Sequence, residues 1–292
     1  WNASRMHVHT RLQPKYDGIT GIGIYADGMY EHDLHVGELL DHLKKLGVED
    51  NTIVMYSTDN GAEKFTWPDG GTTIFRGEKG SSWEGGHRIP LLVKWPGVIK
   101  PGTEINDMIH HNDWLPTFAA AAGESNIVEK LKKGTKIQGQ DYKVHLDGYN
   151  FMPYFAGKTD QGPRNTYFYF SGDGALEAVR WNDWKVSFAA RFGMGGHGGD
   201  GNMAQAQTVI PPAPLVTHLR ADPVEFAVTH SSLYKRWFID NMWIFVPIGG
   251  EIQKFVATLD QYPLQEGMSL NPANLNYSTL KLKKLAETIT TM

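Results

Sequence analysis

The stretch "IVMYSTDNGAEKFTWPDGGTTIFRGEKGSSWEGG" (residues 53–86) contains the pattern that decides the fold. It opens with a continuous β-branched and apolar run, which is typical of a strand covered on both faces. The run ends abruptly at Asp59-Asn60-Gly61, and a long loop rich in glycine, tryptophan and charge follows. In open α/β sheets ligands bind beyond the carboxyl ends of the strands, so we expect Asp59 and Asn60 to emerge at such an edge.

The segments on either side of this stretch extend the α/β pattern. Apolar residues recur every three or four positions over residues 29–46, which predicts a helix that ends at Gly47. After the loop, "IPLLVKW" (89–95) predicts a second strand, and "DWLPTFAAAAG" (113–123) predicts a helix capped by Asp113. Together these elements predict a mixed, mostly parallel sheet flanked by helices.

The sequence changes in character after about residue 160. Short aromatic runs separated by turn residues, at 164–172, 175–183 and 184–190, predict a small antiparallel sheet. Residues 193–214 predict an irregular excursion, and helices are expected at 234–246, 251–261 and 280–292. We therefore expect two domains, an α/β domain over 1–160 and a C-terminal α+β subdomain over 161–292.

Composition excludes several classes of function. The 292 residues carry a net charge of -4, which is not typical of a nucleic-acid-binding surface. No apolar run is long enough to span a membrane. The absence of cysteine excludes disulfides, thiolate metal sites and a cysteine nucleophile within these residues.

The acid and amide at the end of the first strand have two interpretations. Asp59 and Asn60 supply hard oxygen ligands, which suit Ca²⁺ or Mg²⁺, but Asp-Asn-Gly is also a strong turn sequence. Lys79, in the loop that follows, could help to hold a tetrahedral oxyanion beside such a metal, or it could be a solvated surface lysine.

The histidines near the N-terminus also have several possible roles. His7 and His9 stand two apart, so on a strand both would face the same side. They could hydrogen-bond an anion, protonate a leaving group, form a zinc pair, or be structural.

Taken together and in order, four longer pieces resemble a known family. They are "YSTDNG", "FRGEKGSSWEGGHRIPLLVKWPG", "HHNDWLPTFAAAAG" and "LDGYNFMPYFAG", preceded by "RMHVHTRLQP". They are similar to the second half of type I arylsulfatases, which have an alkaline-phosphatase-like α/β fold. The resemblance covers residues 1–190 best and implies a sulfuric ester hydrolase.

The resemblance also implies roles for individual residues. Asp59 and Asn60 match the family's second pair of calcium ligands, and Lys79 matches the lysine that contacts the sulfate. His7 matches the sulfate-binding histidine, with His9 as the alternative. Glu84, Gly85, Gly86, Arg88 and Pro90 match the structural segment that leads into the next strand.

One departure from the family pattern is large. The family's formylglycine nucleophile arises from a cysteine or serine motif in the first half of the enzyme, and that motif is absent from these 292 residues. We therefore expect this chain to be inactive alone, with a sulfate-ester small molecule or glycan as the substrate of the intact enzyme. A second chain that supplies the missing half is one arrangement to consider.

Two alternatives and the compartment stay open. A phosphodiesterase or phosphonate hydrolase of the same superfamily is one alternative, and a truncated, non-catalytic fragment is the other. The compartment is undetermined, with a periplasmic or secreted location favoured over a cytoplasmic one.

Overall fold

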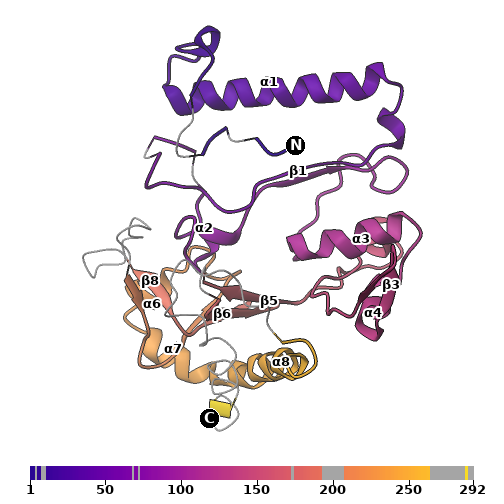
Figure 1. Cartoon of the computed structure of the whole chain (residues 1–292). Helices are drawn as coiled ribbons and strands as arrows, with labels where there is room; N and C mark the ends of the chain where they lie inside the picture. Colours follow the sequence, from indigo (N-terminus) through magenta and orange to yellow (C-terminus); the bar gives the residue numbers. More distant parts are fainter. Residues whose placement is uncertain are drawn as a thin grey trace. The chain divides into compact units, whose positions relative to one another are not determined.

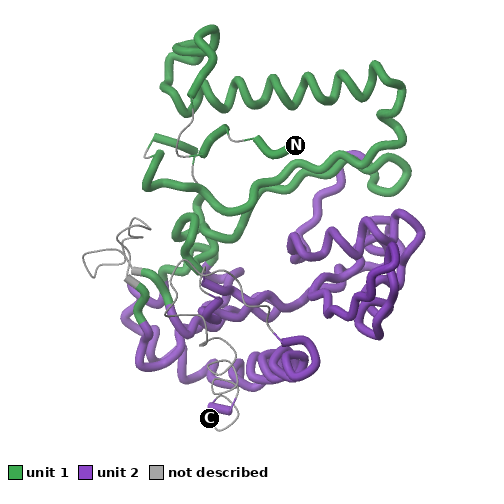
Figure 2. The backbone as a smooth tube through the Cα atoms, in the orientation of Figure 1, with its two compact units in different colours: residues 1–100, 190–209, 223–226 green, residues 101–189, 210–222, 227–292 purple. Residues whose placement is uncertain are grey.

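The computed structural model describes residues 1–3, 5–7, 11–67, 69–71, 73–171, 174–192, 207–263 and 287–288. Figure 1 shows the helices and strands, and Figure 2 shows the two compact units in different colours. Unit 1 comprises residues 1–100, 190–209 and 223–226, and unit 2 comprises 101–189, 210–222 and 227–292. This division by compactness does not test the expected domain boundary near residue 160, which stays a prediction. Among the described helices none is long and apolar enough to cross a membrane.

Unit 1 combines one long helix with short strands. Helix α1 is the longest element, and Gly47, just after it, has the positive φ expected of a helix stop. The elements are η1 (Pro14–Tyr16), α1 (Ile24–Lys45), η2 (Glu49–Asn51), β1 (Val54–Ser57), α2 (Glu84–His87), β2 (Leu91–Lys94), β8 (Ala190–Phe192) and β9 (Gln207–Val209). The predicted helix and both predicted strands of this half are therefore present, and the helix begins five residues earlier than expected.

The strands of unit 1 pair differently from the expectation. β1 runs antiparallel to β2, with Val54 opposite Lys94 and Ser57 opposite Leu91, and every pairing among the described strands is antiparallel. The α/β class holds, but the mostly parallel pairing is not found in the described residues. The connection over residues 58–90 is long, but among its described residues it contains no helix longer than the four-residue α2, whereas parallel neighbours are usually joined by a crossover helix.

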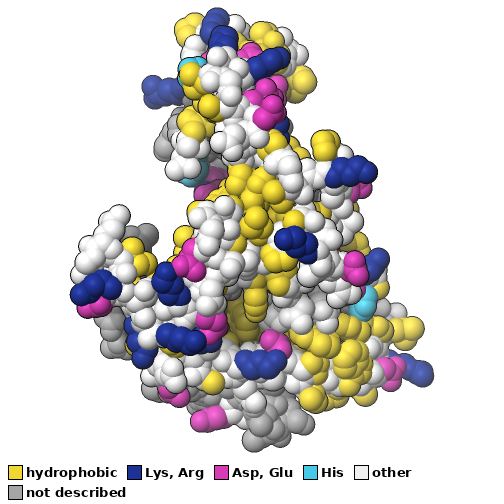
Figure 3. Space-filling model, turned by 90° about the vertical axis from the view of Figure 1, so that its right-hand side faces the viewer, with side chains coloured by type: hydrophobic (Ala, Val, Ile, Leu, Met, Phe, Trp, Pro, Cys, Tyr) yellow, Lys and Arg dark blue, Asp and Glu magenta, His cyan; other side chains and the backbone are white. Residues whose placement is uncertain are grey.

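Burial in unit 1 also departs from the sequence pattern. On α1 the acidic Glu31 is fully buried, whereas Leu39 is 45% exposed and Leu40 and Leu46 are exposed as well. Met55 in β1 is exposed too, so this strand is not covered on both faces as predicted. Figure 3 shows hydrophobic side chains on the face of the molecule that it presents. The periodic apolar positions of α1 identify the helix correctly, but in this chain they do not identify its buried face.

Unit 2 contains the small antiparallel sheet that the aromatic runs predict. Its strands β5 (Thr166–Phe170), β6 (Leu176–Trp181), β7 (Trp184–Ser187) and β10 (Leu215–His218) lie in the order β10-β7-β6-β5. The remaining elements are η3 (His111–Asp113), α3 (Trp114–Ala121), α4 (Ile127–Lys133), β3 (Thr135–Ile137), β4 (Gln140–Tyr142), α5 (Met152–Phe155), α6 (Ala227–His230), α7 (Tyr234–Asp240), η4 (Met242–Ile244) and α8 (Phe245–Thr258). The predicted helix at 280–292 and most of the predicted irregular segment fall outside the described residues.

The core of unit 2 lies between this sheet and α8. Inward residues of the strands pack against one face of the helix and form a single buried cluster of Val179, Val186, Val216, Ile244, Phe245, Ile248 and Ile252. Burial of aliphatic side chains at this scale stabilises each by about 1.5–3 kcal/mol. Unit 2 therefore has a conventional apolar core, in contrast to unit 1.

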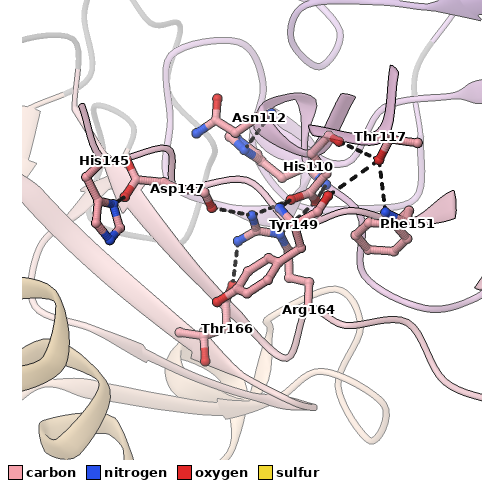
Figure 4. Close-up of polar contacts among 10 residues, drawn as sticks. His110, Asn112, Thr117, His145, Asp147, Tyr149, Phe151, Arg164 and Thr166 are labelled. Atoms are coloured by element: carbon pink, nitrogen blue, oxygen red, sulfur yellow. Dashed lines mark hydrogen bonds and ion pairs between the residues drawn. The ribbon is translucent and has the colours of Figure 1, made fainter. Parts of the chain in front are cut away.

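A buried polar network ties three segments of unit 2 together (Figure 4). The Asp113 carboxylate is fully buried and accepts hydrogen bonds from the backbone N–H groups of His110 (2.7 Å) and Tyr149 (2.8 Å). The Arg164 guanidinium donates to both carboxylate oxygens, at 2.8 and 2.6 Å. Each oxygen of Asp113 thus accepts two hydrogen bonds, and segments 110–117, 147–151 and 164–166 depend on this one carboxylate.

The imidazole of His110 completes the network as an uncharged group. Its Nδ1 accepts a hydrogen bond from the backbone N–H of Asn112 at 3.2 Å, and its ring lies 5.0 Å from that of Tyr167. Burial, followed by the nearby Arg164 charge, lowers the pKa of His110 from 6.5 to about 4, against the opposing effect of Asp113.

The lowered pKa of His110 makes the folding stability depend on pH. Between pH 6.5 and about 4 the unfolded chain binds a proton at His110 that the folded chain does not, so stability falls as the pH falls through this window. We expect a loss on the order of 2 kcal/mol, after allowance for the partial exposure of the ring. In urea unfolding at several pH values, His110→Asn should remove this part of the slope, because asparagine does not titrate. The variant should still fold, because the amide oxygen can replace Nδ1 as the acceptor for the Asn112 N–H.

Candidate functional site

The candidate site begins in the loop that follows β1. Asp59 and Asn60 come two and three residues after the end of this strand. The Asn60 amide nitrogen donates to the carbonyl oxygen of Gly61 at 2.8 Å, and the Thr58 hydroxyl donates to the carbonyl oxygen of Asn60 at 2.7 Å. These bonds form a tight local turn. Within this turn the Asn60 side chain hydrogen-bonds through its amide nitrogen, and its Oδ1 does not take part.

Glycines bring this turn against the segment around α2. Gly61 donates its N–H to the carbonyl oxygen of Gly86 at 3.0 Å, and a Cβ on Gly61 would lie 1.8 Å from the carbonyl oxygen of Gly85. Gly85 is equally confined, since its own Cβ would lie 2.5 Å from the carbonyl oxygen of Arg76. Only glycine tolerates such close backbone contact. The glycine-rich composition noted in the sequence therefore serves to pack the two loops together.

The packed loops bring three polar side chains to one place. The Lys79 ammonium lies 2.8 Å from Oε2 of Glu63 and 3.3 Å from Nε2 of His7. The backbone N–H of Lys79 also donates to the carbonyl oxygen of Ala62 at 2.9 Å. His7 and Lys79, two residues that the resemblance implicates, are thus in contact although they are 72 positions apart.

The chemistry of an ammonium group fixes the roles in this contact. It has three N–H donors and no acceptor, so His7 Nε2 must accept, and the neutral ring carries its proton on Nδ1. Glu63 and His7 use two of the three N–H donors, and the third has no partner in the described part of the chain. The cluster therefore offers one charged donor to a ligand.

Other polar residues of this region are structural. The Arg76 side chain is buried, donates to the carbonyl oxygen of Glu225 at 2.9 Å and lies over the Trp83 ring. Arg88 pairs with Glu84 at 2.8 Å. The hydroxyl of Ser81 is buried and donates to the carbonyl oxygen of Glu78. Of Arg76, Arg88 and Lys79, Lys79 is the one whose geometry suits a ligand.

The structure gives no contact for two of the residues predicted from the sequence, within the part of the chain that it describes. His9 falls outside the described residues. Asp59 is exposed, and in the ranges that the structure describes no hydrogen bond or ion pair engages its carboxylate. Glu63, by contrast, was not identified from the sequence at all. A single acid in a polar loop carries no pattern, and only its position three residues after Asn60 could have drawn attention to it.

The donor set at Asp59 and Asn60 fits part of a hard-cation site. A carboxylate and an amide oxygen are the ligand types that Ca²⁺ prefers. Asn60 keeps its Oδ1 available because its nitrogen makes the local hydrogen bond. The described residues contain no group of three or more His, Cys, Asp or Glu placed to hold a metal. These two residues could therefore contribute ligands to a cation, but they do not form a complete site.

Comparison with known proteins identifies the region that contains these residues. The model of the Sulfatase family matches residues 6–124, a range that includes every site residue named above. Steryl-sulfatase of Rattus norvegicus is 34% identical over 186 residues, which cover 61% of this chain and 30% of the relative. Arylsulfatase of Hemicentrotus pulcherrimus is 32% identical over 185 residues, covering 62% and 30%. The chain thus spans about a third of the length of the curated relatives that it matches.

Solved structures agree with the sequence matches. The PsFucS1 sulfatase from Pseudoalteromonas sp. superposes with a TM-score of 0.68 and 28% identity, over 86% of this chain and 46% of that one. Ps i-CgsB in complex with k-i-k-neocarrahexaose superposes with a TM-score of 0.63 over 98% of this chain and 53% of that one; at 21% identity it supports the fold alone. On these matches, residues 6–124 belong to the sulfatase family, and the chain represents a partial region of such a protein.

Proposed function

We propose that this chain forms part of a sulfuric ester hydrolase and contributes Lys79 and His7 to the site that receives the sulfate group. The observation that carries the proposal is the 3.3 Å contact between these two side chains, which leaves one N–H of the ammonium for a ligand oxygen. Membership of the sulfatase family supports a sulfate ester as the substrate class. A sulfate group presents several oxygens to one cation, and charge-assisted hydrogen bonds to such oxyanions are strong.

The two residues have different tasks in this proposal. Lys79 places a fixed positive charge beside the sulfate oxygens, where charge develops as the ester bond breaks. His7 holds its proton on Nδ1 while Nε2 faces Lys79, so in this arrangement it orients the ammonium and does not itself donate through Nε2. Asp59 and Asn60 would contribute to holding a calcium ion, whose chemistry when bound is to polarise and neutralise the sulfate oxygens.

The remaining parts of the proposal concern the intact enzyme. The nucleophile, a formylglycine by family resemblance, would come from residues other than these 292, and the chain alone would not turn over sulfate esters. A second polypeptide that carries the nucleophile is the partner that this arrangement would need. A sulfate-ester small molecule or glycan is the substrate class that the family resemblance implies. A periplasmic or secreted location fits such substrates.

Sulfate binding by the chain itself tests the role of Lys79. Removing the ammonium deletes a charge-assisted hydrogen bond, so Lys79→Met should weaken sulfate affinity by roughly tenfold to a hundredfold. The affinity can be measured by calorimetry with sodium sulfate, against chloride at equal ionic strength. Lys64→Met removes the same charge from the same loop and is expected to change the affinity far less. Equal losses in both variants would show that the anion responds only to net charge.

A further inference from the structure

We propose that Glu63 is a positioning residue that holds the Lys79 ammonium and, through it, selects the tautomer of His7. The inference rests on the proposed sulfate site, because Lys79 and His7 are the groups that Glu63 would place. Glu63 touches neither a substrate nor a metal in this scheme. It acts on the site through Lys79 alone.

The Glu63 carboxylate is largely buried, and its hydrogen bonds fix its position beside the Lys79 ammonium. Its side chain is only 7% exposed, and each oxygen has one specific partner. Oε1 accepts from the Thr66 hydroxyl at 2.8 Å, and Oε2 accepts from Lys79 at 2.8 Å. A buried carboxylate without a cation is costly, so the pairing fixes the position of the ammonium.

The backbone around Glu63 is anchored to the Lys79 segment on both sides. Ala62 accepts the backbone N–H of Lys79 at 2.9 Å, and the backbone N–H of Phe65 donates to the buried Glu78 carboxylate at 2.9 Å. Glu78 is the neighbour of Lys79 in the chain. Two backbone attachments therefore flank the ion pair, and this geometry leaves Glu63 and Lys79 little freedom to separate.

The electrostatic balance agrees with this geometry. Burial raises the pKa of Glu63, but the hydrogen bonds from Lys79 and Thr66 and the Lys79 charge outweigh it, so the pKa lies below its ordinary value. A carboxyl group with a lowered pKa stays ionised at neutral pH, and its contribution to stability is lost only as the pH falls through that lowered value. The carboxylate that grips Lys79 is thus present throughout the neutral range.

The tautomer of His7 provides a readout that a purely structural ion pair would not affect. With Lys79 held in place, the neutral ring must keep Nε2 unprotonated and Nδ1 protonated. Long-range ¹H–¹⁵N spectra of the full chain with ¹⁵N-labelled histidine distinguish the two nitrogens, at a mildly alkaline pH where the rings are neutral. The His7 signals are assigned by their loss in His7→Gln.

We expect Glu63→Gln to abolish the preference of His7 for the Nδ1–H tautomer, and Glu63→Asp to retain part of it. Lys79→Met should cause the same loss with Glu63 intact. Glu49→Gln, which breaks the exposed Lys94–Glu49 pair of the same unit, should leave His7 unchanged. An unaltered His7 tautomer in folded Glu63→Gln, or in Lys79→Met should Glu63→Gln not fold, would overturn the inference.

A sulfate titration separates this inference from the proposed function. If sulfate shifts the His7 signals of the unmodified chain, the sulfate site is supported independently of Glu63. If sulfate has no effect but Glu63→Gln still changes the tautomer, the positioning role of Glu63 is upheld while its link to a sulfate site fails.

Discussion

Asp113→Asn is expected to destabilise the chain by about 3–5 kcal/mol, because it leaves the buried Arg164 guanidinium without a counter-charge. The amide that replaces the carboxylate has one oxygen and one NH₂ group. Every donor around Asp113 points at an oxygen, two at each. Whichever way the amide turns, its NH₂ group must therefore face two other donors, at a site that is fully buried.

Urea unfolding of the full chain, followed by tryptophan fluorescence, measures this loss. Asp147→Asn is the matched control, since its carboxylate is exposed and pairs with His145 at 3.2 Å, and it should cost less than about 1 kcal/mol. In the double variant Asp113→Asn/Arg164→Met, the loss should be smaller than the sum of the two single losses, because no charge is left unpaired. A strictly additive result would mean that the ion pair contributes nothing through its own interaction.

The elements that could be predicted from the sequence are those whose signals are local. The apolar run before Asp59, the glycine stop after α1 and the turn residues between the aromatic strands each act over a few residues. They therefore locate β1, α1 and the sheet of unit 2 within a few positions. The proposal that Lys79 and His7 act together came from family resemblance, since no local pattern links two residues 72 apart.

Burial and pairing could not be predicted in the same way, because they depend on which segments pack together. The apolar stripe of α1 suggests that Leu39 and Leu40 face a core, but in the described chain Glu31 is buried instead and pairs with Arg5 at 2.7 Å. The direction of β2 depends on the path of the loop before it and not on its composition. Glu63 becomes recognisable only after that loop has folded against Lys79.

The candidate site thus depends on close contact between two glycine-rich segments more than on any single polar residue. Asp59 and Asn60 lie on one segment and Lys79 on the other. The backbone bonds Gly61–Gly86 and Lys79–Ala62 are the described links that set their separation. A change that forces the segments apart should therefore damage stability and the site together.

Gly61→Ala is the sharpest form of that change, and we expect it to destabilise the chain by about 3 kcal/mol or more. The added Cβ would lie 1.8 Å from the carbonyl oxygen of Gly85 and 2.8 Å from its carbonyl carbon. Both atoms are backbone, so neither can swing aside as a side chain would. The turn must move away from the α2 segment, which breaks the Gly61–Gly86 hydrogen bond and shifts Asn60 relative to Lys79.

Gly37→Ala provides the comparison, because both variants add the same methyl group to unit 1. Gly37 lies within α1, and a Cβ there meets no atom within 4 Å. Alanine favours a helix over glycine by roughly 0.5–1 kcal/mol, so this variant should be slightly more stable than the original chain. In denaturant unfolding, the free energy of unfolding should fall in Gly61→Ala and rise slightly in Gly37→Ala. Sulfate binding should be weakened only in Gly61→Ala. Equal stability of the two variants would contradict the close contact between the loops, and with it the geometry that brings Lys79 to the site.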